Sequence, residues 1–172
     1  MLRFVRPALV HLPALADYRR EVLASGGDFD GTAGLGSFRE PADWLARAAL
    51  LDSPEAARRG WYPTRILLGM REERICGIVN VRLSGEESLL AAAGNIGYHV
   101  RPSERRRGYG RELLLAGVSL CRANGIPAPV LLILQENTPS VRTALSAGFR
   151  EDGMTALPDG RAAQRFLWAE PG

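Results

Sequence analysis

A cluster of arginines followed by two glycines is the part of this sequence whose residue types could do chemistry. The stretch RRRGYG runs from Arg105 to Gly110, and an apolar pattern with helical spacing follows it at once. Glycines let the backbone approach a ligand closely, and the first turn of a helix has N–H groups without intrahelical acceptors. These groups carry a partial positive charge, and guanidinium groups bind phosphate oxygens in pairs. The stretch therefore predicts a site for a phosphate-bearing small molecule.

Two common phosphate-binding loops do not fit this stretch. A P-loop ends in Gly-Lys-Ser/Thr, and that ending does not occur in this sequence. The dinucleotide fingerprint needs Gly or Ala at its third glycine position, where this chain has Leu113. We therefore expect an anion that is neither a P-loop nucleotide nor a dinucleotide.

Composition narrows the class of protein. The chain has 172 residues, of which 46% are hydrophobic and 24% charged, as in a single globular domain. A nucleic-acid-binding protein ranks last, because the arginine cluster is short and 19 acidic residues balance it. No stretch has the length of a membrane span, and Arg3, Arg6 and Pro7 interrupt any secretory apolar region. We expect a cytoplasmic protein that contacts neither nucleic acid nor a membrane.

The two cysteines do not suggest a metal site. Cys76 and Cys121 lie within apolar runs and lack the spacing of a metal-binding motif or a disulfide framework. We expect buried, reduced thiols and no bound metal.

The elements around the arginine-rich stretch alternate between strands and helices. Thr138 is the predicted N-cap of the last helix, and Gly148 its C-terminal glycine. Residues 26–38, GGDFDGTAGLGSF, fit no periodic pattern and are predicted to be a loop. Apolar spacing predicts helices at residues 12–24, 40–51, 109–124 and 138–149, and β-rich runs predict strands at residues 2–8, 64–70, 75–83, 93–100, 129–135, 150–157 and 161–170.

At this point a resemblance to a known family becomes specific. Residues 100–110, VRPSERRRGYG, resemble the acyl-CoA signature Arg/Gln-x-x-Gly-x-Gly/Ala of the GNAT superfamily of N-acyltransferases, with Arg105, Gly108 and Gly110 in the defining places. The block LLILQENTPSVRTALSAGF resembles the family's following strand and helix, in which an Asn, here Asn137, contacts the pantetheine. The wider stretch, from about residue 61 to 150, is similar to a less-characterised bacterial branch of the superfamily.

The resemblance implies an α/β (α+β) fold. The expected sheet is mixed, mostly antiparallel, splayed between its fourth and fifth strands, and flanked by helices. One acyl-CoA N-acyltransferase domain would cover residues 1–172. Within it, residues 1–62 would supply the N-terminal strand, the helices and an acceptor-side loop, residues 63–150 the CoA-binding core, and residues 151–172 the closing strands.

The resemblance also implies acetyl-CoA as co-substrate. The main chain of His99 and Val100 would pair with the pantetheine as an added strand would, and residues 105–110 would hold the pyrophosphate. The residues expected to bind CoA are His99, Val100, Arg105, Arg106, Arg107, Gly108, Tyr109, Gly110, Arg111 and Asn137.

The reaction implied is transfer of an acetyl group to a primary amine of a small molecule or peptide, by direct attack in a ternary complex. The family's usual tyrosine acid falls on Ala144, and its fourth-strand base falls near Gly94 or Asn95, none of which can titrate. Asn95 and Glu136 are the candidate catalytic residues. A catalytically silent acyl-CoA-binding module is the alternative function. The acceptor amine and homodimer formation stay open.

Overall fold

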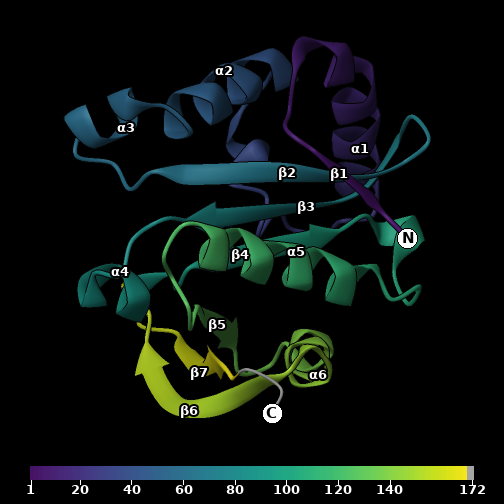
Figure 1. Ribbon diagram of the computed structural model, residues 1–172. Helices are drawn as coiled ribbons and strands as arrows, with labels where there is room; N and C mark the ends of the chain where they lie inside the picture. Colours follow the sequence, from purple (N-terminus) through teal and green to yellow (C-terminus); the bar gives the residue numbers. More distant parts are fainter. Residues whose placement is uncertain (170–172) are drawn as a thin grey trace.

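Two β-sheets with helices packed on their faces make up the computed structural model, which describes residues 1–169 (Figure 1). The first sheet has the order β1-β2-β3-β4 and the second the order β5-β7-β6. Every registered strand pair is antiparallel. The α/β class with antiparallel sheets flanked by helices is confirmed.

The strands are β1 (Arg3–Val5), β2 (Thr64–Arg71), β3 (Arg74–Arg82), β4 (Ile96–Val100), β5 (Val130–Leu134), β6 (Phe149–Ala156) and β7 (Ala162–Trp168). The helices are α1 (Leu12–Ala24), α2 (Pro41–Leu51), α3 (Pro54–Arg58), α4 (Glu87–Ala92), α5 (Tyr109–Ala123) and α6 (Thr138–Ala147). Single 3-10 turns cover Leu9–His11, Leu35–Ser37 and Pro102–Glu104.

All predicted helices and strands are present, with small shifts at their ends. The sequence did not predict α3 and α4, because helices of 5 and 6 residues are too short to show an apolar stripe. The predicted N-cap Thr138 is wrong: Asn137 is the N-cap of α6, and its side chain accepts a hydrogen bond from the Ser140 N–H at 3.2 Å. Residues 170–172 of the expected closing segment lie outside the described residues.

The first sheet is buried on both faces. Side chains alternate along β3, so Val79 and Val81 join the core under α5, while Ile78 joins the core under α1 and α2. Gly117 lets α5 approach the sheet, since a Cβ there would lie 2.9 Å from the Ile96 side chain. Both cysteines are free and buried, as the sequence predicts.

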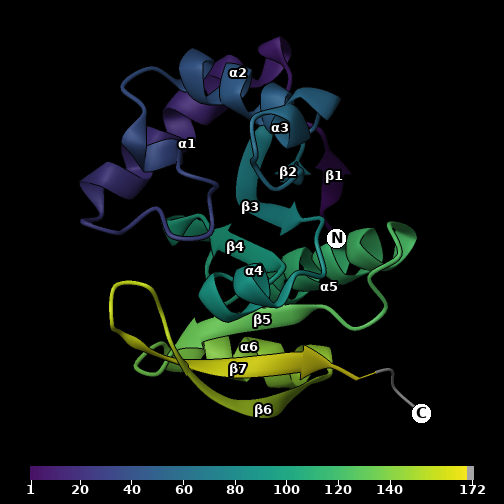
Figure 2. The same ribbon diagram turned by 90° about the vertical axis from the view of Figure 1, so that its left-hand side faces the viewer.

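The two sheets meet where β4 and β5 begin, near the middle of Figure 2. The Asn95 N–H donates to the Val130 carbonyl at 2.7 Å, and the Asn95 side-chain oxygen accepts from the Val130 N–H at 2.9 Å. Beyond this contact β4 pairs with β3, and β5 pairs with β7. The expected splay between the fourth and fifth strands is therefore confirmed, and the contact at Asn95 is its vertex.

Asn95 fixes this vertex with its whole side chain. Its Nδ2 donates to the Arg82 carbonyl at 3.1 Å and to the Ser84 carbonyl at 2.8 Å, and the residue is 1% exposed. Since both N–H groups and the oxygen of the amide bond to main chain, none of them is free for a substrate. The geometry therefore gives Asn95 a structural role in place of the catalytic role suggested by the sequence.

Replacing Asn95 with Ala should lower the free energy of unfolding by about 2–4 kcal/mol, because it leaves buried main-chain groups without partners. Urea denaturation followed by circular dichroism measures this loss. Asn124→Ala is the control, because the exposed Asn124 side chain also bonds to a carbonyl, at 2.8 Å, and should cost about 1 kcal/mol or less. An Asn95→Ala variant of wild-type stability that has lost turnover would restore the catalytic interpretation.

Candidate functional site

The arginine-rich stretch forms a turn between β4 and α5 with a concave main chain. The backbone is left-handed at Arg106 (φ 60°) and at Gly108 (φ 82°). Within residues 1–169, no main-chain N–H from 106 to 110 bonds to a protein acceptor. A Cβ on Gly108 would have no atom within 4 Å, so space is open beside the backbone. Free N–H groups at the start of a long helix, beside open space, have the geometry of a candidate anion site.

Helix α1 fixes the start of this turn. The Arg101 side chain is 2% exposed, and its guanidinium bonds to Asp17 at 2.5 Å and to Glu21 at 2.6 Å. Glu21 also accepts the Ser103 N–H at 2.8 Å. Partial burial raises the pKa of Glu21, but hydrogen bonds from Ser103 and Arg101 outweigh it and hold the pKa at about 2. The carboxylate is thus ionised at neutral pH and anchors the turn.

Three arginine side chains surround the turn. Arg105 donates to the Val100 carbonyl at 3.4 Å, and Arg107 pairs with Glu104 at 3.6 Å. Arg106 is exposed and has no hydrogen bond or ion pair to any described residue. The turn therefore carries positive charge beside its free N–H groups.

Two other predicted CoA ligands have packing roles for their side chains. Tyr109 is 5% exposed, and its hydroxyl accepts a hydrogen bond from Arg71 at 2.9 Å. Arg111 donates to the Ser146 carbonyl at 3.0 Å and so joins α5 to α6. Tyr109 can offer the anion site its main-chain N–H, whereas the Arg111 N–H already bonds to the Gly108 carbonyl at 3.1 Å.

Gly110 was expected to border the pyrophosphate, but a side chain at this position would not point into open space. A Cβ there would lie 3.4 Å from Thr143 and 3.5 Å from the Tyr98 ring, which are ordinary van der Waals distances. A side chain at Gly110 would therefore point toward α6 and β4. Among the two glycines of the signature, Gly108 is the one that faces open space.

β4 has one main-chain edge toward the gap between the sheets. In an antiparallel strand, the N–H and C=O groups of alternate residues point to opposite edges. The Asn95 carbonyl and the Arg101 N–H both bond to the main chain of β3. His99 is an even number of residues from each of them, so its main-chain N–H and carbonyl also point toward β3. The main-chain groups of Tyr98 and Val100 then face the gap. The register favours Val100, but not His99, as a partner for an added strand.

The His99 side chain packs against α1. Its Nδ1 shares a hydrogen bond with the Tyr18 hydroxyl, and its buried Nε2 has no hydrogen-bond partner within the described part of the chain. Burial, helped by the positive charge of Arg105, lowers the pKa of His99 to about 4. The imidazole is therefore neutral at neutral pH.

Tyr98 is a functional candidate that the sequence did not single out. Its hydroxyl lies 2.8 Å from the Ser140 Oγ in the first turn of α6. Ser140 and Ala144 are one helical turn apart, so the phenol approaches the face of α6 where the resemblance places the family's tyrosine. Burial raises the pKa of Tyr98, and the group is protonated at neutral pH. The sequence did contain one signal for this position: Tyr98 alternates with Ile96 onto the same face of the predicted strand.

The two remaining candidates lie between β5 and α6. Asn137 uses its side-chain oxygen as the cap of α6, and its Nδ2 has no bond to residues 1–169. Glu136 is exposed and near the charge of Arg161. β4 and β5 begin together at the vertex, so Asn137, after β5, and the 105–110 turn, after β4, both follow strands that lead away from it (Figure 2).

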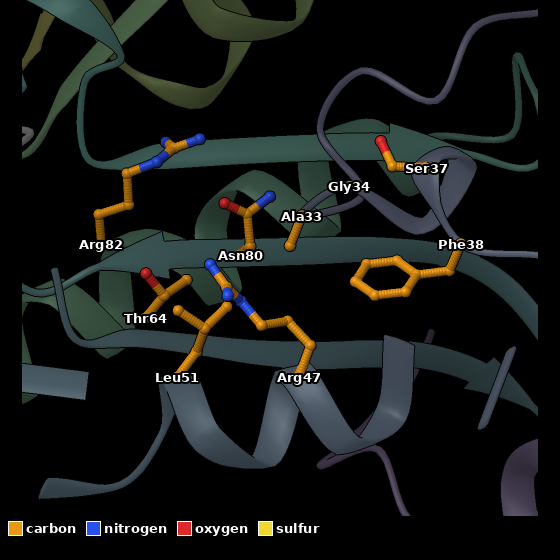
Figure 3. A pocket seen from close by; sticks show the side chains of 9 residues that line it. All are labelled: Ala33, Gly34, Ser37, Phe38, Arg47, Leu51, Thr64, Asn80 and Arg82. Carbon is orange, nitrogen blue, oxygen red and sulfur yellow. The ribbon is translucent and has the colours of Figure 1, made fainter. Parts of the chain in front are cut away.

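A pocket of about 280 Å³ lies on the face of the first sheet that α2 covers, opposite the face that α5 covers (Figure 3). The loop at residues 26–38, helix α2 and the ends of β2 and β3 enclose it. This loop lies within residues 1–62, the part of the chain from which the resemblance implies an acceptor-side loop. The pocket is lined by Ala33, Gly34, Ser37, Phe38, Arg47, Leu51, Thr64, Asn80 and Arg82.

Comparison with known families agrees with this geometry. The family model described as an acetyltransferase (GNAT) domain matches residues 2–150. The chain belongs to the GNAT acetyltransferase family. It is accordingly an acetyl-CoA-dependent acyltransferase.

Solved structures of GNAT acetyltransferases share the fold. The ribosomal-protein-S5-alanine acetyltransferase from Vibrio fischeri aligns with a TM-score of 0.71 at 14% identity, covering 96% of this chain and 91% of that one. The microcin C7 self-immunity acetyltransferase MccE, solved with acetyl-CoA and AMP, aligns with a TM-score of 0.69 at 16% identity, with coverage of 96% and 91%. The Salmonella typhimurium acetyltransferase that modifies the N-terminal serine of ribosomal protein L7/L12 gives 0.67 at 17% identity, with coverage of 99% and 95%.

Other comparisons add little. A search of curated proteins gives no match. No helix within residues 1–169 is long and apolar enough to cross a membrane. In the same residues, no group of three His, Cys, Asp or Glu side chains is arranged to hold a metal ion.

Gly108→Ala should weaken CoA binding by about tenfold or more, because the new methyl group enters the open space beside the free N–H groups. Calorimetric titration with CoA measures the change. Gly125→Ala is a matched control: Gly125 follows the other end of α5 with φ 79° and also has no atom within 4 Å. Both variants should lose about 1–2 kcal/mol of stability through left-handed strain, but only Gly108→Ala should lose affinity. Equal CoA affinity in the two variants would contradict the anion site.

Proposed function

We propose that this protein transfers the acetyl group of acetyl-CoA to a primary amine of a small molecule or peptide, by direct attack in a ternary complex. The observation that carries the proposal is the row of free N–H groups at residues 106–110, beside the gap that opens between β4 and β5. The pocket of about 280 Å³ on the α2 side of the first sheet offers room for an acceptor.

The geometry suggests how acetyl-CoA would bind. The N–H groups of residues 106–110 would hold the pyrophosphate, helped by the charges of Arg105, Arg106 and Arg107. The pantetheine would lie along the edge of β4 that faces the gap, at Tyr98 and Val100, and would pair with it as an added strand does. The free Nδ2 of Asn137 would donate to the same arm of the co-substrate.

Few groups near the gap can move a proton. The Ala144 side chain has no proton to donate, and every polar atom of the Asn95 amide is hydrogen-bonded to main chain at the vertex. Tyr98 can donate the proton that the departing thiolate needs as the C–N bond forms and the C–S bond breaks. The proton released from nitrogen would pass to water or to Glu136, the exposed carboxylate next to Asn137.

The function is tested by release of free CoA thiol from acetyl-CoA in the presence of primary amines. Acetylated amine, identified by mass spectrometry, should appear in proportion to the thiol. A protein that binds CoA in calorimetry but releases thiol from no amine above the rate of hydrolysis would be the silent acyl-CoA-binding module.

Tyr98→Phe should lower kcat by about 100-fold or more, because a positioned general acid contributes about that much. CoA affinity should change little. Ser140→Ala keeps the Tyr98 hydroxyl and removes its partner, so it should cost much less than Tyr98→Phe. Steady-state kinetics of both variants separates the two roles: equal losses would mean that the hydroxyl only joins β4 to α6.

Glu136→Gln should leave most of the activity, because an amine that is already deprotonated can attack without a strong base. The kcat/KM profile should rise with pH along the ionisation of the acceptor amine in both proteins. Glu73→Gln, in the exposed β2–β3 turn, is the control. A large loss of rate in Glu136→Gln together with loss of the acidic limb would identify Glu136 as the general base.

A further inference from the structure

Two arginines, Arg82 and Arg47, line the pocket in Figure 3. Arg82, at the end of β3, donates to the carbonyls of Ala93 and Gly94, each at 3.3 Å, and pairs with no carboxylate in the described residues. Burial lowers the pKa of Arg82, and no negative charge among residues 1–169 offsets this effect. Holding a partly buried cation without an anion is unfavourable. The site would be stabilised by an anion from outside the chain.

Arg47 brings a second positive charge to the same pocket. It comes from α2, its guanidinium lies 3.7 Å from the centre of the Trp61 ring, and it has no ion pair among residues 1–169. Figure 3 shows its side chain reaching across the pocket toward Asn80. None of the residues that line the pocket is an Asp or Glu. The charge of the two arginines is therefore not balanced locally.

Asn80 adds an unpaired hydrogen-bond acceptor. Its Nδ2 donates to the Gly31 carbonyl at 2.7 Å and to the Gly97 carbonyl at 3.1 Å, which fixes the orientation of the amide. Its Oδ1 is buried and has no partner within residues 1–169, and the residue is 1% exposed. Buried acceptors are nearly always satisfied. A ligand with an N–H or O–H donor would complete this one.

We propose that this pocket recognises the acceptor, and that the acceptor is an amine carrying an oxyanion, either a carboxylate or a phosphate. The oxyanion binds Arg82 and Arg47, and a donor group of the same molecule binds the Oδ1 of Asn80. This proposal rests on the proposed acetyl transfer, because it assigns the second substrate of that reaction. Asn80 donates to the Gly97 carbonyl, so the pocket borders β4, the strand whose residues Tyr98 and Val100 face the gap.

Matched pairs of amines test this assignment. Each pair consists of an amino acid and its carboxamide, and a second series replaces the carboxylate with a phosphate ester. In the wild-type protein, kcat/KM for the acid should exceed that for the amide by about 10–100-fold, the usual effect of losing charge-assisted hydrogen bonds. The preferred oxyanion, carboxylate or phosphate, identifies which of the two sources the pocket takes.

The variants Arg82→Gln and Arg47→Gln should each reduce this acid-to-amide ratio toward one. Arg150→Gln, an exposed arginine on β6, is the control and should keep the ratio. Thermal unfolding verifies that each variant is folded, and Arg82→Lys, which keeps the charge, provides a second test if Arg82→Gln is unstable. CoA affinity should stay within about twofold in all of them, since these side chains lie outside the anion site of α5.

The outcomes separate this inference from the proposed function. If no amine is acetylated, the proposed function fails. Calorimetry with the same acids and amides then still tests the pocket, and preference for the acids that is lost in both Arg82→Gln and Arg47→Gln supports it. Equal kcat/KM for acid and amide in the wild type, or a ratio unchanged in both variants, would overturn the inference.

Discussion

The contact between Asn95 and Val130 is the constraint on which the rest of the site depends. It joins two antiparallel sheets through the residue that precedes β4 and the first residue of β5. A continuous sheet would satisfy the facing main-chain groups of these strands, and no edge would be left for a ligand. A complete separation would remove the shared core under α5. A single contact, formed by main-chain groups and the fully hydrogen-bonded Asn95 amide, holds the two sheets in one fold. It also lets β4 and β5 diverge beyond it, which leaves the gap.

The anion site depends on a second constraint, the attachment of the turn to α1. Arg101 follows β4 directly, and the ion pairs of its buried side chain with the partly exposed Asp17 and Glu21 fix where the chain turns toward α5. Such pairs contribute little net stability, because the desolvation of the buried guanidinium offsets the attraction. They do fix geometry, and a backbone binding site needs its N–H groups held in place more than it needs added charge.

The sequence predicted the elements of this site better than its contacts. The arginine-rich turn, the helix after it and the splayed sheet follow from local signals: glycines, an N-terminal helix pattern and a family signature. The phase of β4, which separates Val100 from His99, depends on pairing with β3 and is not visible in residue types. Arg82 and Asn80 were missed for the same reason. An arginine and an asparagine in a strand look ordinary until the structure shows that, in the described part of the chain, no carboxylate reaches Arg82 and no donor reaches the Oδ1 of Asn80.

Strand β4 lies between the two proposed substrate sites and borders both of them. Its main-chain edge at Tyr98 and Val100 faces the gap, while its face at Gly97 meets the loop over the pocket. The loop can approach this closely because of a glycine: a Cβ on Gly31 would lie only 2.1 Å from the Tyr98 carbonyl oxygen. Asn80 then ties Gly31 and Gly97 together through one amide. Any movement of this loop therefore changes the pocket and the strand edge together, so in the proposed reaction recognition of the acceptor and placement of the thioester would depend on the same few contacts.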